Sequence, residues 1–199
     1  YLSSISEHDK TEIEKSLQPA DILLEKTPFR LTDRFIPGYW GHVAIWVGSK
    51  EQLQYLGVWD DLPSLYASAQ ARFHYQGPSF QSQVEAGHKI IEALRAGVQI
   101  NTLEHFLNID DMAVVRDESL NHAAQKRYLL RAFSQIGKDY DFNFDVETDK
   151  KIVCSELAFV VYDDYDWPVS KTAGRYTISP DHVSEKADGN GPFTPVILY

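Results

Sequence analysis

The sequence contains a single cysteine, Cys154, and has no long uninterrupted run of apolar residues. One cysteine excludes an internal disulfide and leaves the redox compartment open. A membrane-spanning helix needs roughly 18 consecutive apolar residues, so no transmembrane segment is expected. No signal segment of basic and then apolar residues stands at the start. Because the sequence begins at Tyr1, an exported protein that has lost its signal and a cytoplasmic protein both fit it.

Positive charge is scarce as well. Lys and Arg number 19 against 29 Asp and Glu, which gives a formal net charge of -10. This balance argues against a nucleic-acid partner and against adsorption to anionic lipid. With 199 residues, of which 43% are hydrophobic, the chain is long enough for one well-packed domain and short for two. We therefore expect a single domain over residues 1–199.

The apolar pattern predicts a chain of strands and helices. A tight turn joins two of the strands into a hairpin, and Pro195 makes the last strand an edge strand. The expected strands are 20–25, 42–48, 89–94, 97–100, 112–116 and 193–198. The expected helices are 6–17, 102–106, 119–136, 154 to about 163, and one that begins at Ser179 and Pro180. Residues 27–41 are expected to form a loop, and 139–145 an extended stretch.

The segment 55–86 is an aromatic-rich insertion without a sustained period. Its aromatic residues are spread among glycines, prolines and aspartates, so we predict a long irregular segment. Such segments are usually functional or flexible. The segment could be a lid or a substrate-binding element over the active site. Equally, it could be a surface loop that is held by its own aromatic cluster.

Cys154 begins an apolar-periodic run, in which Leu157, Val160 and Val161 follow Val153 at helical spacing. The thiol should therefore lie in the first turn of a helix, where the unpaired N–H groups and the helix dipole favour a thiolate. A nucleophile is chemically plausible at this place. The alternative is a small buried residue, because free cysteine is among the most buried residue types.

Two further residues stand at unusual positions for their chemistry. His42 heads a nearly continuous apolar strand, and Glu92 interrupts the middle of another strand. A thiol nucleophile needs a base, and the base needs a third group that orients its ring and stabilises the imidazolium. Each residue alone could be structural, as a satisfied buried imidazole or a solvent-facing carboxylate. The three types together favour a catalytic constellation.

No metal and no cofactor is expected. From Asp139 onward, alternate polar residues resemble the first half of a calcium-binding loop. The sixth position of this stretch is Phe144 instead of Gly, and the twelfth is Lys150 instead of Glu. His88 and Glu92 are four residues apart, which would suit a metal only on a helix, and their surroundings predict a strand. The calcium-like residues are Asp139, Asp141, Asn143 and Asp145.

Several motifs together resemble the circularly permuted papain-like cysteine hydrolases, the NlpC-type amidases of the YiiX/YebB-like group. In chain order, the motifs are Ala20-Asp21-Ile22-Leu23-Leu24, Gly41-His42-Val43-Ala44-Ile45, Ile91-Glu92-Ala93 with Gly97-Val98, Asp139-Tyr140-Asp141-Phe142, and Cys154-Ser155-Glu156-Leu157. The resemblance implies an α+β fold in which the cysteine helix packs against an antiparallel sheet. It implies Cys154 as nucleophile, His42 as base and Glu92 as third member. Tyr140 matches a residue near the site, with an oxyanion or substrate-positioning role.

The residues and the resemblance together predict a cysteine hydrolase that cleaves an amide bond, or an ester or thioester, through an acyl-enzyme. The substrate would be a cell-wall peptide or an acylated small molecule or lipid. An acyltransferase with the same intermediate is one alternative, which a closed, aromatic-lined pocket would favour. A binding module that keeps the fold without catalysis is another, which ordinary alkylation kinetics at Cys154 would favour.

Overall fold

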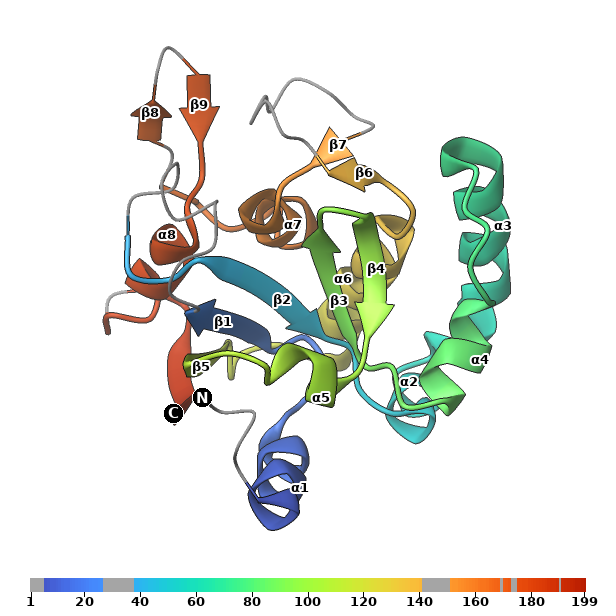
Figure 1. Cartoon of the computed structure of the whole chain (residues 1–199), viewed down its shortest axis with the longest axis horizontal. Helices are drawn as coiled ribbons and strands as arrows, with labels where there is room; N and C mark the ends of the chain where they lie inside the picture. The colour runs from blue at the N-terminus through green and yellow to red at the C-terminus, as the bar shows by residue number, and fades with distance from the viewer. Residues whose placement is uncertain (1–5, 27–37, 141–150, 169, 173–174, 190) are drawn as a thin grey trace.

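A six-stranded antiparallel sheet forms the centre of the molecule in the computed structural model (Figure 1). The structure describes residues 6–26, 38–140, 151–168, 170–172, 175–189 and 191–199. The strand order is β10-β5-β1-β2-β3-β4, and every neighbouring pair is antiparallel. These strands are β1 (Ile22–Lys26), β2 (His42–Trp46), β3 (Ile90–Leu94), β4 (Gly97–Asn101), β5 (Asp111–Arg116) and β10 (Thr194–Leu198). Helices cover this sheet, so the predicted α+β fold class is confirmed.

Most of the predicted elements have the expected type. The hairpin of β3 and β4 forms as predicted, and β10 is an edge strand whose register shifts between Pro195 and Ile197. The helices outside 50–85 are α1 (Glu7–Ser16), α5 (Leu103–Phe106), α6 (His122–Ser134), α7 (Cys154–Val161) and α8 (Pro180–Glu185). Residues 27–37 of the predicted loop and 141–145 of the predicted extended stretch lie outside the described residues.

Two small strand pairs lie beside the main sheet. β6 (Asp139–Tyr140) pairs in parallel with β7 (Lys151–Ile152), which leads directly into α7. β8 (Ser170–Thr172) and β9 (Arg175–Thr177) form an antiparallel pair just before α8, and the sequence pattern did not predict it. The first pair fixes the direction in which the chain reaches Cys154.

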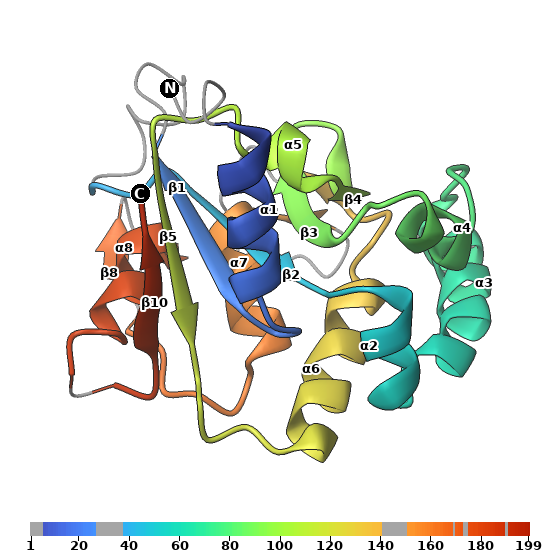
Figure 2. The ribbon, with the colours of Figure 1, turned by 90° about the horizontal axis from the view of Figure 1, so that it is seen from below.

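The main sheet is covered on both faces, which explains why β2 is apolar at nearly every position. Alternate side chains of β2 point to opposite faces, so Val43 and Ile45 join one core cluster, and Ala44 and Trp46 join the other. The first cluster includes residues of α6 and α7, and α7 packs across β2 and β3. The second includes residues of α1 and α5. Figure 2 shows α1 and α7 on opposite sides of β1 and β2.

The insertion 55–86 is helical, so the prediction of an irregular segment is wrong. The helices here are α2 (Lys50–Tyr55), the 3-10 helix η3 (Trp59–Asp61), α3 (Leu62–Phe73) and α4 (Phe80–Glu85). Most of them are too short to show a helical period in the sequence. A proline in the first turn starts α3, and His74 ends it in the left-handed conformation with a φ of 56°.

An aromatic cluster holds the insertion to the rest of the molecule. Phe80 is fully buried, and its ring centroid lies 5.5 Å from that of Tyr66, 5.8 Å from that of Tyr75 and 5.8 Å from that of Phe133 on α6. Figures 1 and 2 both place α3 and α4 at the side of the molecule, away from α7. This placement does not support a lid over Cys154, and the alternative of an aromatic-pinned surface segment describes the insertion better.

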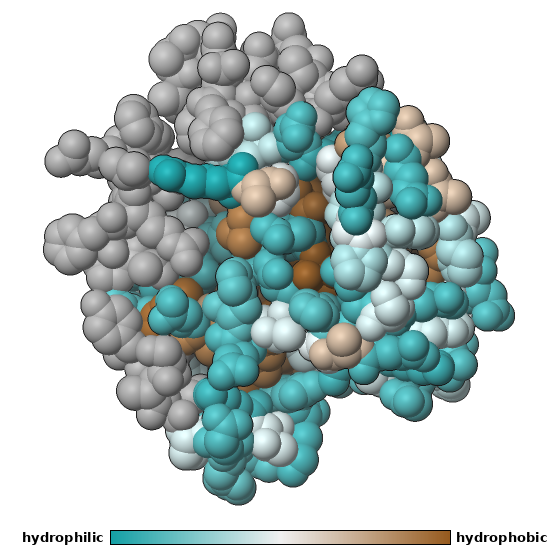
Figure 3. Space-filling view, turned by 45° about the vertical axis from the view of Figure 1, so that its right-hand side comes forward, coloured by the Kyte–Doolittle hydropathy of each residue, from teal (hydrophilic) through white to brown (hydrophobic). Residues whose placement is uncertain are grey.

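The surface seen in Figure 3 is mainly hydrophilic, and apolar side chains show only in patches between polar ones. Among the residues that the structure describes, no helix combines the length and the apolar character needed to cross a bilayer.

Candidate active site

Cys154 is the first residue of α7 and is 2% exposed. The N-cap residue Val153 is extended and has no side chain that could cap the first turn. Its backbone N–H donates to Glu156 Oε2 at 3.0 Å. This hydrogen bond from a residue of the first helical turn fixes the backbone between β7 and α7. The N–H groups of the first turn are therefore not capped by the N-cap side chain. The thiol lies at the positive end of the helix dipole, as the sequence predicted.

His42 and Glu92 meet across neighbouring strands. Glu92 on β3 lies opposite Ala44 on β2, so His42 and Glu92 are diagonal neighbours on the same face of the sheet. His42 Nε2 and Glu92 Oε2 are 2.8 Å apart, and both side chains are buried. The Cys154 side chain is close enough to the His42 ring to be one of the groups that raise the pKa of His42. Since Glu92 occupies Nε2, Nδ1 is the ring nitrogen that remains for the thiol.

The charges of the pair reinforce each other. Burial lowers the pKa of His42, but the hydrogen bonds to Cys154 and Glu92 and the nearby carboxylate of Glu25 raise the pKa well above 6.5. Burial opposes ionisation of Glu92, but hydrogen bonds from His105, His42 and Asn101 hold its pKa far below 4.5. Near neutral pH this environment favours an imidazolium beside a carboxylate.

Three residues around this pair were not found from the sequence. Asn101 Nδ2 donates to Glu92 Oε1 at 2.8 Å, and His105 Nδ1 lies 3.3 Å from the same oxygen. Glu25 on β1 lies directly opposite His42 and is buried. The hairpin register could have revealed Asn101, because Asn101 pairs with Ile90 and so shares a face with Glu92. His105 and Glu25 come from elements whose position depends on the tertiary fold.

Tyr140 lies next to the cysteine through the backbone. It pairs with Ile152 in the small parallel sheet, two residues before Cys154. Its side chain is buried and belongs to the same core cluster as Cys154. The structure therefore brings Tyr140 into the neighbourhood of the thiol, and its role stays a prediction.

A carboxylate from the far end of the chain fixes the approach to His42. Asp181, in the first turn of α8, accepts hydrogen bonds from the backbone N–H groups of Tyr39 and Trp40, each at 2.8 Å. The Tyr39 hydroxyl in turn donates to Asp111 Oδ2 at 2.6 Å. We call the contact of Asp181 with these two N–H groups the Asp181 clamp. It sets the path of the chain two residues before β2 begins.

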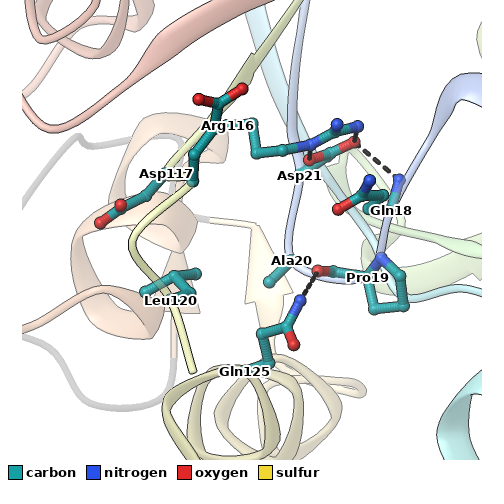
Figure 4. A pocket seen from close by; sticks show the side chains of 9 residues that line it. Gln18, Pro19, Ala20, Asp21, Arg116, Asp117, Leu120 and Gln125 are labelled. Atoms are coloured by element: carbon teal, nitrogen blue, oxygen red, sulfur yellow. Dashed lines mark hydrogen bonds and ion pairs between the residues drawn. The ribbon is translucent and has the colours of Figure 1, made fainter. Parts of the chain in front are cut away.

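A polar pocket of about 280 Å³ lies away from these residues, between the start of β1 and the end of β5 (Figure 4). Asp21 is buried there and accepts two hydrogen bonds from Arg116, with Nε at 2.7 Å from Oδ1. Gln125 donates to the carbonyl of Pro19 at 3.2 Å. The ion pair therefore joins the two strand ends, which gives Asp21 of the family-like motif a structural role.

Within the described part of the chain, no group of three or more His, Cys, Asp or Glu residues is placed to hold a metal ion. Lys150 and the polar residues after Tyr140 in the calcium-like stretch lie outside it.

Comparisons with known proteins agree with this fold. The chain is similar over 92% of its length to a crystal structure described as the metalloprotein yiiX from Escherichia coli O157:H7, with a TM-score of 0.52, 16% identity and 98% of that chain covered. No curated protein matches the sequence. Residues 16–195 match the family described as permuted papain-like amidase enzyme, YaeF/YiiX, C92 family. The resemblance seen in the motifs is confirmed, and the chain belongs to the permuted papain-like amidase enzymes of the YaeF/YiiX family.

Proposed function

We propose that Cys154, His42 and Glu92 form the catalytic triad of a cysteine hydrolase that cleaves an amide bond through an acyl-enzyme. One observation carries the proposal: a buried imidazole lies 2.8 Å from a buried carboxylate, and the only thiol of the chain is near enough to the same imidazole to raise its pKa. A nucleophile, a base and an orienting group within hydrogen-bond reach are what thiol-based acyl transfer requires.

The acylation step follows from the charges. The raised pKa of His42 favours the imidazolium, and the reacting form that we propose pairs it with the thiolate of Cys154. The sulfur attacks the carbonyl carbon, a C–S bond forms, and the carbonyl electrons move onto oxygen. When the tetrahedral intermediate collapses, the C–N bond breaks and imidazolium Nδ1–H gives its proton to the leaving amine. Glu92 keeps the ring oriented and balances its charge throughout.

Deacylation uses the same residues in reverse roles. Neutral His42 takes a proton from water, the resulting hydroxide attacks the thioester carbonyl, and the C–S bond breaks to release a carboxylic acid. The thiolate and imidazolium are then restored. The backbone N–H groups at the start of α7 are the candidate donors to the oxyanion in both steps, and Tyr140 is the candidate side chain beside them.

The substrate class that we propose is a short peptide or another acylated amine, such as a cell-wall peptide or an acylated small molecule or lipid. The family is one of amidases, which supports an amide as the scissile bond. The acidic balance of the chain, with a net charge of -10, disfavours strongly anionic substrates.

The test uses p-nitrophenyl acetate as an activated acyl donor and a panel of peptide p-nitroanilides as amides. We expect a burst of about one equivalent of p-nitrophenolate, because thiol acyl-enzymes accumulate with activated esters. Mass spectrometry should find the acetyl group on Cys154. Cys154→Ala removes the only thiol and should abolish the burst. His42→Ala should slow acylation by about 10²–10⁴-fold, the usual contribution of a positioned base.

His122→Ala is the matched control, because His122 is an exposed imidazole on α6, on a helix that carries none of the triad residues. It should acylate at the parent rate. Acetyl groups found only on lysines, or full turnover by Cys154→Ala, would overturn the proposal.

A further inference from the structure

The triad carboxylate has a second set of partners on its other oxygen. Glu92 is 2% exposed, and its two oxygens face different residues. Oε2 faces His42 at 2.8 Å, whereas Oε1 accepts from Asn101 Nδ2 at 2.8 Å and lies 3.3 Å from His105 Nδ1. Asn101 ends β4 and His105 belongs to α5, so two further elements hold the carboxylate.

We infer that Asn101 and His105 are positioning residues of the reaction, which act by holding Glu92 so that Oε2 faces His42. This inference rests on the proposed function. It assigns two residues to the site that the sequence pattern did not reveal, and it predicts that their effect passes through the Glu92 carboxylate.

Hydrogen-bond chemistry gives each residue a defined role. An ionised carboxylate can only accept, so His105 must carry a proton on Nδ1 when it contacts Oε1. Asn101 likewise presents its amide NH₂ group, since its side-chain oxygen would repel the carboxylate. Two donors on Oε1 and one on Oε2 fix the plane of the carboxylate, which would otherwise rotate about the end of a flexible side chain.

The two holding residues differ in exposure. The His105 side chain is 57% exposed, whereas His42 and Glu92 are buried. The contacts of the Glu92 carboxylate therefore run from the buried His42 to an imidazole at the surface.

The other charged groups nearby come from three elements. Glu25 of β1 faces His42, Glu104 stands beside His105 on α5, and Lys10 of α1 is attracted to Glu104. Glu104 is exposed and carries the same charge as Glu92. It therefore offers a control for a general change of charge around α5.

The experiment measures the rate of Cys154 alkylation by iodoacetamide as a function of pH, which needs no substrate. Loss of one donor loosens Glu92 and weakens its support of the imidazolium, so Asn101→Ala should move the midpoint of the labelling curve upward. A hydrogen bond to a charged group corresponds to a shift of about one pH unit, or about tenfold slower labelling at a fixed pH below the midpoint. His105→Ala should shift it in the same direction, and His105→Gln, which keeps a donor, should restore most of the parent curve.

A double-mutant cycle separates positioning from mere stability. In a Glu92→Gln background, Asn101→Ala should move the labelling midpoint clearly less than in the parent, because the carboxylate through which Asn101 acts is absent. A structural role would instead change the melting temperature in both backgrounds and the labelling curve in neither. Asn101→Ser serves as a second variant if the alanine substitution lowers the folded fraction, and Glu104→Gln should reproduce the parent curve.

The outcomes distinguish this inference from the proposed function. A parent protein that alkylates like an ordinary exposed thiol, unaffected by His42→Ala, would overturn the triad itself. If His42→Ala shifts the labelling curve but Asn101→Ala and His105→Ala give the same curve as the parent, only the positioning role would be overturned. Equal midpoint shifts in the parent and Glu92→Gln backgrounds would also overturn it.

Discussion

Replacing Glu92 by glutamine removes one negative charge from the site and keeps the size of the side chain. The carboxylate accepts at both oxygens, with His42 at 2.8 Å on one side and Asn101 at 2.8 Å on the other. A glutamine can accept at only one end. If its oxygen faces His42, its NH₂ group meets the NH₂ group of Asn101. If its NH₂ group faces His42, Nε2 must accept, and the ring then carries its proton on Nδ1, where a general base needs a lone pair.

The magnitude follows from the charge. An opposite charge within about 4–6 Å shifts the pKa of a partner by about 1–3 units, and burial of both side chains leaves little solvent to screen the pair. Loss of the carboxylate should therefore lower the pKa of His42 by about 1–3 units, which is about 1.4–4 kcal/mol of support for the imidazolium. With less imidazolium, less thiolate forms at acidic pH. The labelling midpoint of Cys154 should move upward by about the same amount.

The assay compares pH–rate curves for iodoacetamide labelling of the parent, Glu92→Gln and His42→Ala, with intact-mass detection of the single alkylated cysteine. The parent should label at the lowest pH, His42→Ala at the highest, and Glu92→Gln between them, because the ring is still held without charge balance. Amide turnover by Glu92→Gln should fall by about 10²–10⁴-fold. Superimposed curves for the three proteins would refute the reasoning, since the helix end alone would then account for the state of the thiol.

Two further outcomes concern stability. Phe80→Ala should lower the free energy of unfolding by about 3–5 kcal/mol in urea titration, because it empties the centre of the aromatic cluster; Tyr55→Ala, at a 75% exposed site, should change it by no more than about 0.5 kcal/mol. Because α4 lies away from α7, folded Phe80→Ala should keep the parent labelling curve, and a changed curve would contradict this expectation. The destabilisation caused by Glu92→Gln should depend on pH. The lowered pKa of Glu92 stabilises the folded protein above pH 4.5, and this contribution is lost as the pH falls through the pKa of Glu92 in the folded protein. The raised pKa of His42 stabilises the folded protein below pH 6.5, and this contribution is lost as the pH rises through the pKa of His42 in the folded protein. The gap between parent and variant should thus be largest from pH 4.5 to 6.5, and a gap that stays constant from about pH 3 to 9 would contradict the ion pair.

The central sheet could be predicted because its signals are local. An apolar run headed by His42, a tight turn after Leu94 and Pro195 in the last strand each determine the element they belong to. The start of α7 at Cys154 follows from the same reasoning, since helical spacing begins there. These local signals were enough to place the three proposed triad residues on three defined elements.

The remaining features depend on contacts that no short pattern encodes. The helices of residues 50–85 are mostly a few turns or less. Phe80 packs against Phe133 of a later helix as well as against Tyr66 and Tyr75 of its own segment. His105 reaches Glu92 because α5, which follows β4, lies beside the end of the β3–β4 hairpin (Figure 1). Asp181 finds its partners across more than half of the chain. Sequence reasoning identifies the elements here, and tertiary packing decides which polar side chains meet.

A ribosome adds Tyr39 and Trp40 to the growing chain 142 and 141 positions before Asp181. Folding during synthesis proceeds from the N-terminal side, so the strands around His42 can pair while the clamp is still missing. Cys154 also precedes α8. A nascent protein that stops short of α8 thus carries all three proposed triad residues without the carboxylate that fixes the approach to β2. We therefore expect the thiol to reach its full reactivity only after α8 has been translated.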